Sequence, residues 1–278
     1  MNLLSDTSLL ISLPADGFAI MPTIDKFAPW RIQASIYKCI LYATEKKMIR
    51  KTRRPSIAKR TQAAEVSKKL MDVYGPIEWE PRYNAAEELV YTILSQHTSD
   101  INSERAFLNL MKTFGDLYSI ANSPILEIET AIRRGGLAKI KAPRIKNILN
   151  EVLKEVGSFD LSFLAEMPLH EAKSWLTKLN GVGPKTAAII LCFSFGLPAM
   201  PVDTHIFRVA QRLGLIGKKI TAEKAHDLLE PIVPPDEVFQ FHMFLIKHGR
   251  DTCKAQRPKC DSCELHNLCP SASKFSKK

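Results

Sequence analysis

The sequence has no apolar run long enough to cross a membrane. Its longest candidate, residues 187–202, is interrupted by a serine, a glycine and two prolines, and it is shorter than the roughly 20 residues that a spanning helix needs. The N-terminus lacks the basic region of a secretory signal and carries Asp6 and Asp16 instead. We therefore expect a cytoplasmic protein whose six cysteines remain reduced and form no disulfides.

Alternation of apolar and polar residues, the pattern of a half-buried strand, is also missing over any useful length. Apolar residues recur instead with helical spacing. Asn84 precedes one such stripe, with Glu87 placed as its capping-box partner, and Gly115 and Gly157 follow two later stripes. The pattern therefore predicts an all-α fold. Further helices are expected at 204–213, 221–229 and 236–248.

An excess of positive charge is the main feature of the composition. The net charge is +10 and the pI is about 9.3, in a chain whose 45% apolar and 24% charged residues are typical of a soluble globular protein. This balance favours a polyanionic partner, of which nucleic acid is the usual one, although many basic proteins bind no polyanion. Residues 50–69 are strongly basic. Such a run forms either a solvated tail or a surface along phosphates.

Residues 1–47 show no clean periodicity, and we interpret them as an N-terminal extension. Short helices are possible only at 9–13 and 36–42, and Met48 is a candidate native start. Two cysteines stand alone. Of these, Cys192 lies in an apolar stripe and is expected to be a small core residue, whereas Cys39 falls within the extension.

A tight turn at Gly181-Val182-Gly183 leads into a helix that opens at Pro184. Glycine lets the backbone turn sharply and lets another molecule approach closely, and proline suits the first helical position. The free amides at such a helix start favour a phosphate. Lys185 lies on the first turn of this helix, and Asp203 comes eighteen residues later, just before another helix.

Four cysteines gather near the C-terminus with the spacing C-x6-C-x2-C-x5-C, namely Cys253, Cys260, Cys263 and Cys269. Four thiolates this close together in a reducing compartment indicate a metal site. Four-cysteine zinc sites usually carry two short C-x2-C pairs, and only one is present here. A [4Fe-4S] cluster is the other group that four cysteines hold.

Two motifs, Leu-x-Gly-Val-Gly-x-Lys-Thr-Ala and Val-Asp-Thr-His-x-x-Arg-Val, follow each other from residue 179. Together with the cysteine spacing, they resemble the endonuclease III family of helix-hairpin-helix DNA glycosylases, over roughly residues 60–270. The resemblance implies two lobes with a DNA cleft between them. The lobes are a six-helix barrel with the hairpin, at 82–198, and an iron–sulfur lobe formed by 60–81 and 199–278.

The resemblance also implies a [4Fe-4S] cluster on the four cysteines, because His248-Gly249-Arg250 precede them as in the family's cluster loop. Three cations lie between the first two cysteines: Lys254, Arg257 and Lys259. We expect them to contact DNA phosphates. The alternative is that they only keep the loop soluble.

In the family's chemistry, a lysine at the position of Lys185 attacks C1′ of a flipped nucleotide and forms a Schiff base, and β-elimination then cuts the strand. A lysine amine must lose a proton before it attacks, and a helix N-terminus contributes only ~0.3–1 kcal/mol toward that. Asp203 is the implied helper, as a proton acceptor or as a stabiliser of charge on the sugar. Asp203 is also well placed as a helix N-cap, and both roles are compatible.

Two further positions follow from the resemblance. Leu137, after Gly136 and before Lys141-Ala142, corresponds to a leucine that wedges into the duplex, unless it is a buried loop residue. In the family, a glutamine in the segment that corresponds to Leu94–Asp100 fills the gap that the flipped base leaves in the duplex. Here His97 stands at that position, and Gln96 lies one residue earlier. Either side chain could fill the gap, which leaves the opposite-strand preference open.

The sequence therefore predicts a bifunctional DNA glycosylase/AP lyase that removes oxidised pyrimidines during base excision repair. Its partner would be double-stranded DNA with a damaged base or an abasic site, and we expect a monomer associated with the nucleoid and not with membranes. Two alternatives stay open. One is a mismatch-specific glycosylase, although such enzymes typically lack the lysine. The other is a non-catalytic module that binds DNA through the hairpin (Gly181, Val182 and Gly183).

Overall fold

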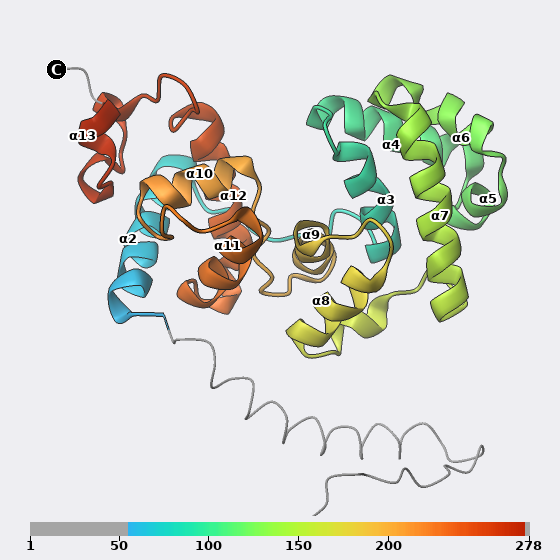
Figure 1. The fold of residues 1–278 in the computed structure, drawn as a ribbon, viewed down its shortest axis with the longest axis horizontal. Helices are drawn as coiled ribbons and strands as arrows, with labels where there is room; N and C mark the ends of the chain where they lie inside the picture. The colour runs from blue at the N-terminus through green and yellow to red at the C-terminus, as the bar shows by residue number, and fades with distance from the viewer. Residues whose placement is uncertain (1–54, 276–278) are drawn as a thin grey trace, which may run out of the picture. The chain divides into compact units, whose positions relative to one another are not determined.

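A computed structural model describes residues 55–275. This part of the chain is helical and contains no strand, which confirms the all-α prediction (Figure 1). None of its helices is both long enough and apolar enough to span a membrane. The helices expected at 9–13 and 36–42, Cys39 and the candidate start at Met48 lie outside the described residues.

The first hydrophobic core is built from helices in the middle of the chain. Its largest fully buried side chains include Leu89, Leu110 and Leu149, and each such burial contributes roughly 1.5–3 kcal/mol. The elements that carry this core are α3 (Ala85–Ser95), α4 (Asp100–Phe114), α5 (Leu117–Asn122), α6 (Ile125–Ile132), η2 (Arg133–Gly135), α7 (Ala138–Val156), η3 (Ser162–Ala165), α8 (Leu169–Lys178) and α9 (Pro184–Phe195).

A second core joins the first described helix to the C-terminal third of the chain. Its elements are α2 (Ile57–Tyr74), α10 (Thr204–Arg212), α11 (Ala222–Leu229), η4 (Glu230–Ile232), η5 (Pro235–Glu237), α12 (Val238–Asp251), η6 (Cys260–Ser262), η7 (His266–Leu268) and α13 (Ala272–Phe275). The two cores draw on the same parts of the chain that the family pattern assigns to its two lobes. The lobe boundaries themselves stay a prediction.

The basic segment is a packed helix from Ile57 onward. Ala63, Val66 and Leu70 are buried on one face of α2. On the same helix, Lys59 Nζ donates a hydrogen bond to the carbonyl of Gly214. A solvated tail is therefore wrong for this part of the segment, because burial of three apolar side chains fixes the helix. Phosphate contact by its exposed lysines stays a prediction.

The helix ends follow the local signals. Asn84 Oδ1 accepts a hydrogen bond from Glu87 N at 3.0 Å, and Gly115 and Gly157 end α4 and α7 at φ values of 84° and 79°. Helix α10 ends one residue earlier than expected. The helix predicted at 236–248 is α12, Val238–Asp251, because Pro234 and Pro235 first set a 3-10 turn.

Candidate functional site

The turn between α8 and α9 has the predicted hairpin geometry. Val182 N donates to the carbonyl of Leu179 at 3.1 Å, and the buried Val182 side chain anchors the turn in the first core. Gly181 has a φ of 85°, a left-handed value that favours glycine. Gly183 is the N-cap of α9 and Pro184 is its first residue. The sequence therefore folds here as predicted.

The hairpin leaves its glycine amides available. Within the described residues, the amides of Gly181 and Gly183 make no hydrogen bond. A Cβ built on either glycine would meet no atom within 4 Å, so both face open space. Free amides at a helix N-terminus favour an anion, because the helix dipole adds positive potential there. This arrangement suits a phosphate group.

Lys185 and Asp203 occupy the starts of consecutive long helices. Lys185 is exposed on the first turn of α9. Asp203 caps α10, since its Oδ1 accepts a hydrogen bond from Ile206 N at 2.7 Å. The predicted capping role of Asp203 is thus confirmed. Its Oδ2 has no hydrogen-bond partner in the described part of the chain.

A buried imidazole on α12, His242, lies next to the start of α10. His242 Nδ1 donates to the carbonyl of Pro201 at 3.0 Å. Burial lowers the pKa of His242 to about 4; the hydrogen bond to Pro201 and the charge of Asp203 oppose this shift, and the charges of Lys185 and Arg82 reinforce it. The charges of Lys185 and Asp203 therefore have opposite effects on the pKa of His242. Sequence reasoning missed His242, because no motif marks it.

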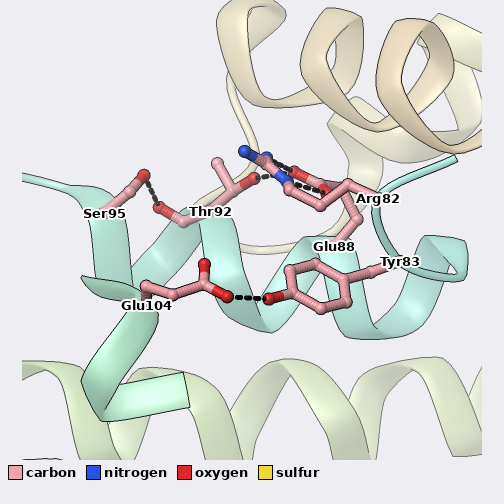
Figure 2. A network of polar contacts seen from close by, with 6 residues as sticks. All are labelled: Arg82, Tyr83, Glu88, Thr92, Ser95 and Glu104. Atoms are coloured by element: carbon pink, nitrogen blue, oxygen red, sulfur yellow. Dashed lines mark hydrogen bonds and ion pairs between the residues drawn. The ribbon is translucent and has the colours of Figure 1, made fainter. Parts of the chain in front are cut away.

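An arginine and a glutamate form a second polar feature near this imidazole. Arg82 Nε donates to Glu88 Oε2 at 3.0 Å, and Arg82 Nη2 pairs with Glu88 Oε1 (Figure 2). The Glu88 side chain is fully buried, and burial raises its pKa while Arg82 opposes that rise. Figure 2 also shows a separate pair, in which Tyr83 Oη donates to Glu104 at 2.7 Å. Sequence reasoning missed both pairs.

Two exposed loop residues carry left-handed backbone angles. His97 and Leu137 each have a φ of 54°. Leu137 is 49% exposed, so the interpretation of Leu137 as a buried loop residue is wrong. Gln96 Oε1 accepts a weak hydrogen bond from Arg144 Nη1 at 3.3 Å, whereas the His97 side chain is exposed. Which of the two fills a gap in DNA remains a prediction.

A buried lysine fastens these two loops together. Lys141 is 2% exposed, and its Nζ donates to the carbonyl of Leu94 and to Thr98 Oγ1, each at 2.6 Å. It also donates to the carbonyl of Gly135 at 3.3 Å. Burial lowers the pKa of Lys141. The sequence marked Lys141 only as part of a motif, and its connecting role depends on contacts that a motif does not show.

The four C-terminal cysteines line one small cavity, which Val209, Leu265 and Phe275 help to enclose. Burial raises the pKa of the thiols of Cys260, Cys263 and Cys269, in the case of Cys263 to about 11. Burial thus favours the neutral thiols. A bound cation would favour the thiolates instead. Within the described residues, no three histidine, cysteine or acidic side chains are gathered closely enough to hold a single metal ion. Four cysteine thiolates are a donor set that suits a [4Fe-4S] cluster.

Arginines of α10 hold the cysteine loop. Arg212 Nη1 donates to Cys253 Sγ at 3.3 Å and to the carbonyl of Lys254 at 2.7 Å. Arg208 Nε donates to the carbonyl of Cys253 at 3.0 Å. The three predicted phosphate-binding cations on this loop are all exposed: Lys254, Arg257 and Lys259. The loop is therefore ordered with its charges facing outward.

Comparison with known proteins agrees with this geometry. The profile of HhH-GPD superfamily base excision DNA repair proteins matches residues 90–235. The chain is 38% identical to a candidate DNA glycosylase of Arabidopsis thaliana, over 64% of each protein and so just under two thirds of the plant protein's length. It is 34% identical to endonuclease III of Sulfolobus acidocaldarius, over 67% of this chain and 82% of that protein. It is also 34% identical to endonuclease III of Escherichia coli K12, over 66% of this chain and 82% of that protein.

Solved structures give the same result. A trapped endonuclease III–DNA covalent intermediate matches with a TM-score of 0.67 at 29% identity, over 77% of this chain and 97% of that one. A thermostable thymine-DNA glycosylase also reaches a TM-score of 0.67, but at 21% identity it supports the fold alone. The chain belongs to the endonuclease III family, within the HhH-GPD superfamily of base excision DNA repair proteins. By family it is a base excision repair DNA glycosylase.

Proposed function

We propose that this protein is a bifunctional DNA glycosylase/AP lyase that excises oxidised pyrimidines and then cuts the strand 3′ to the abasic site. One observation supports this most strongly: Lys185 is exposed on the first turn of α9, directly after the free glycine amides of the hairpin, and Asp203 caps α10 with one carboxylate oxygen left unbonded. The related structure of a trapped endonuclease III–DNA covalent intermediate also supports a covalent route.

Double-stranded DNA is the proposed partner, and the protein acts on it as a monomer. The amides of Gly181 and Gly183 bind a phosphate at the start of α9. Leu137 enters the stack where the damaged nucleotide leaves, and Gln96 or His97 occupies the vacated space. The exposed left-handed backbone at His97 and Leu137 places both side chains outward from the first core. Flipping costs a few kcal/mol, which these contacts offset.

The proposed chemistry begins at the amine of Lys185. Its Nζ attacks C1′, and the glycosidic electron pair leaves with the base. The nitrogen lone pair then breaks the C1′–O4′ bond, O4′ takes up a proton, and the open sugar is held as a Schiff base. Loss of a C2′ proton finally expels the 3′ phosphate by β-elimination. Asp203 accepts a proton from the amine or stabilises positive charge on the sugar, using the Oδ2 that its capping role leaves free.

The cluster is proposed to have a structural role. Cys253, Cys260, Cys263 and Cys269 would hold a [4Fe-4S] group, which when bound cross-links the C-terminal loop. The chain's own contribution is the set of cations on that loop. Lys254, Arg257 and Lys259 contact phosphates, and the Arg212 hydrogen bonds to Cys253 and Lys254 keep the loop in place.

The test is covalent trapping on a duplex with a preformed abasic site in the presence of borohydride. We expect wild-type protein to form a stable adduct and to nick the strand without borohydride. Lys185→Ala should form no adduct, whereas the exposed Lys178→Ala control at the end of α8 should trap normally. If wild type neither traps nor nicks, the non-catalytic module is the better explanation.

A second assay separates the two glycosylase classes. Single-turnover excision is measured on duplexes with thymine glycol and with a G·T mismatch. The proposal predicts excision of thymine glycol and little release of mismatched thymine. Preference for the mismatch would instead support the mismatch-specific alternative.

A further inference from the structure

Arg82 contacts aromatic side chains of α3 and α9. Its guanidinium carbon is 4.2 Å from the ring centroid of Tyr91 on α3 and 4.9 Å from that of Phe193 on α9. The Phe193 ring lies edge-on to His242 of α12, with centroids 5.5 Å apart. His242 Nδ1 in turn donates to the carbonyl of Pro201, two residues before Asp203. A chain of side-chain contacts therefore leads from Arg82 to the start of α10.

The guanidinium of Arg82 is held in one orientation. Glu88 takes both Nε and Nη2, as Figure 2 shows. Thr92 supports Glu88 with a weak hydrogen bond from its Oγ1 at 3.4 Å, and two aromatic faces fix the plane of the guanidinium. Such fixation lowers the entropy that a later hydrogen bond would otherwise lose.

One edge of this guanidinium is left free. Arg82 Nη1 makes no hydrogen bond within the described residues, and 35% of the side chain is exposed. A carboxylate as deeply buried as Glu88 is costly to desolvate, and an apolar pair of similar size often serves stability as well. The pair therefore has a feature that stability does not require: a fixed donor, Nη1, that no protein group in the described part of the chain uses, on a side chain that is partly exposed.

We propose that Arg82 is a specificity-determining residue that reads the flipped base. Its free Nη1–H donates to a carbonyl oxygen of that base. The inference rests on the proposed glycosylase function and deepens it. Arginine has only donors, so it favours bases that present a carbonyl group, as oxidised pyrimidines do. It disfavours adenine, which has none.

The same hydrogen bond assists departure of the base. When the glycosidic bond breaks, its electron pair moves onto the base and negative charge spreads to the carbonyl oxygens. A charge-assisted hydrogen bond from Arg82 then becomes stronger than in the ground state. Cleavage at a preformed abasic site involves no base, so it gains nothing from Arg82.

The experiment compares two single-turnover rates: excision of an oxidised pyrimidine from duplex DNA, and strand cleavage at a preformed abasic site. Removal of one preorganised donor costs about 10²–10³-fold. We therefore expect Arg82→Met to lose roughly 100-fold in excision, with abasic cleavage almost unchanged. Arg105→Met, which removes an exposed arginine from α4, should match wild type in both assays.

Arg82→Lys is the second variant, for use if Arg82→Met does not fold. It keeps a cation beside Glu88 but has no equivalent of the free Nη1 group. It should remain folded by thermal denaturation and show the same selective loss. Wild-type excision by Arg82→Lys, or equal losses in both assays, would overturn the inference. Absence of abasic cleavage in the wild type would instead count against the proposed lyase function.

Discussion

His242 is a buried side chain of α12 that lies next to the start of α10. Its Nδ1–H donates to the carbonyl of Pro201, two residues before Asp203. Burial makes the charged form of the imidazole unfavourable.

The depressed pKa of His242 has a consequence for stability. The unfolded chain binds a proton at His242 below about pH 6.5, whereas the folded chain binds it only near pH 4. Unfolding therefore takes up a proton within this window, and stability falls as pH is lowered through it. The contribution of this residue is at most about 3.4 kcal/mol. It is present above pH 6.5 and lost by about pH 4.

The measurement is the free energy of unfolding at several pH values between 6.5 and 4. His242→Gln should show a shallower pH dependence than wild type, and the exposed His170→Gln should not. Some slope will remain, because burial also lowers the pKa values of His226 and His248. Identical slopes for His242→Gln and wild type would contradict the assignment.

The family motifs marked Lys185 and Asp203 as candidates, and their catalytic roles stay a prediction. Neither the motifs nor the local signals marked Arg82 or His242. Arg82 depends on Phe193, more than a hundred residues away, and His242 depends on Pro201. Such contacts arise from tertiary packing, which residue spacing along the chain does not encode.

At the scale of elements, we expect the two glycines of the hairpin to be needed for different reasons: Gly181 for its backbone angle and Gly183 for the approach of a phosphate. Gly181 has a φ of 85°, which L-residues rarely adopt, so Gly181→Ala should destabilise the protein by about 1–2 kcal/mol. Gly183 has an ordinary φ of −91°, and a Cβ there meets open space. Gly183→Ala should fold with nearly wild-type stability.

Gly183→Ala should nevertheless bind an abasic duplex roughly tenfold more weakly, about 1.4 kcal/mol. The added methyl group stands where the phosphate would approach the amide. Fluorescence anisotropy at fixed salt measures this affinity, and chemical denaturation measures the stability of the same variant. Unchanged affinity would show that the amide of Gly183 does not contact phosphate.

The loops that carry His97 and Leu137 depend on one side chain of α7. Lys141→Met would remove three hydrogen bonds, to Leu94, Thr98 and Gly135. We expect a loss of roughly 2 kcal/mol in the free energy of unfolding. Excision from duplex DNA should also slow, because the wedge and the gap-filling segment lose their common anchor.

Chemical denaturation measures the stability change, with Lys139→Met as the control. Lys139 is exposed in the first turn of the same helix, and its substitution should change stability by less than about 0.5 kcal/mol. Equal stability of the two variants would mean that Lys141 does not hold the loops.

Most helices were predictable because their apolar stripes and caps are local. Gly115 and Gly157 end α4 and α7 as expected. The error at α12 has a simple cause: Pro234 and Pro235 delay the start of the helix, and the 3-10 turn between them and α12 has no distinct sequence pattern. No local pattern predicts that α2 packs against α12, because the two helices are far apart in the chain. Only the family resemblance grouped residues 60–81 with 199–278.

For the molecule as a whole, the cysteine loop covers one side of the second core. Cys253, Cys263 and Cys269 pack against that core, and Arg212 joins the loop to α10. A bound cluster would add the free energy of metal binding to the stability of this region. The expected consequence is that folding of the second core depends on the cofactor.

Freshly purified protein should contain about four irons and four acid-labile sulfides per chain. Cys263→Ser should lower both and should destabilise the protein by several kcal/mol. The buried Cys192→Ser, far from the loop in sequence, should keep its iron. Stoichiometric zinc without sulfide would contradict the cluster assignment.

The central claim is that Lys185 is the amine that becomes covalently joined to DNA. Mass spectrometry of peptides from the borohydride-reduced complex tests it most directly, because the adduct marks one lysine. The account predicts the sugar fragment on Lys185, in the peptide that begins the α9 helix. An adduct on another lysine, on the α-amino group or on no residue at all would contradict it.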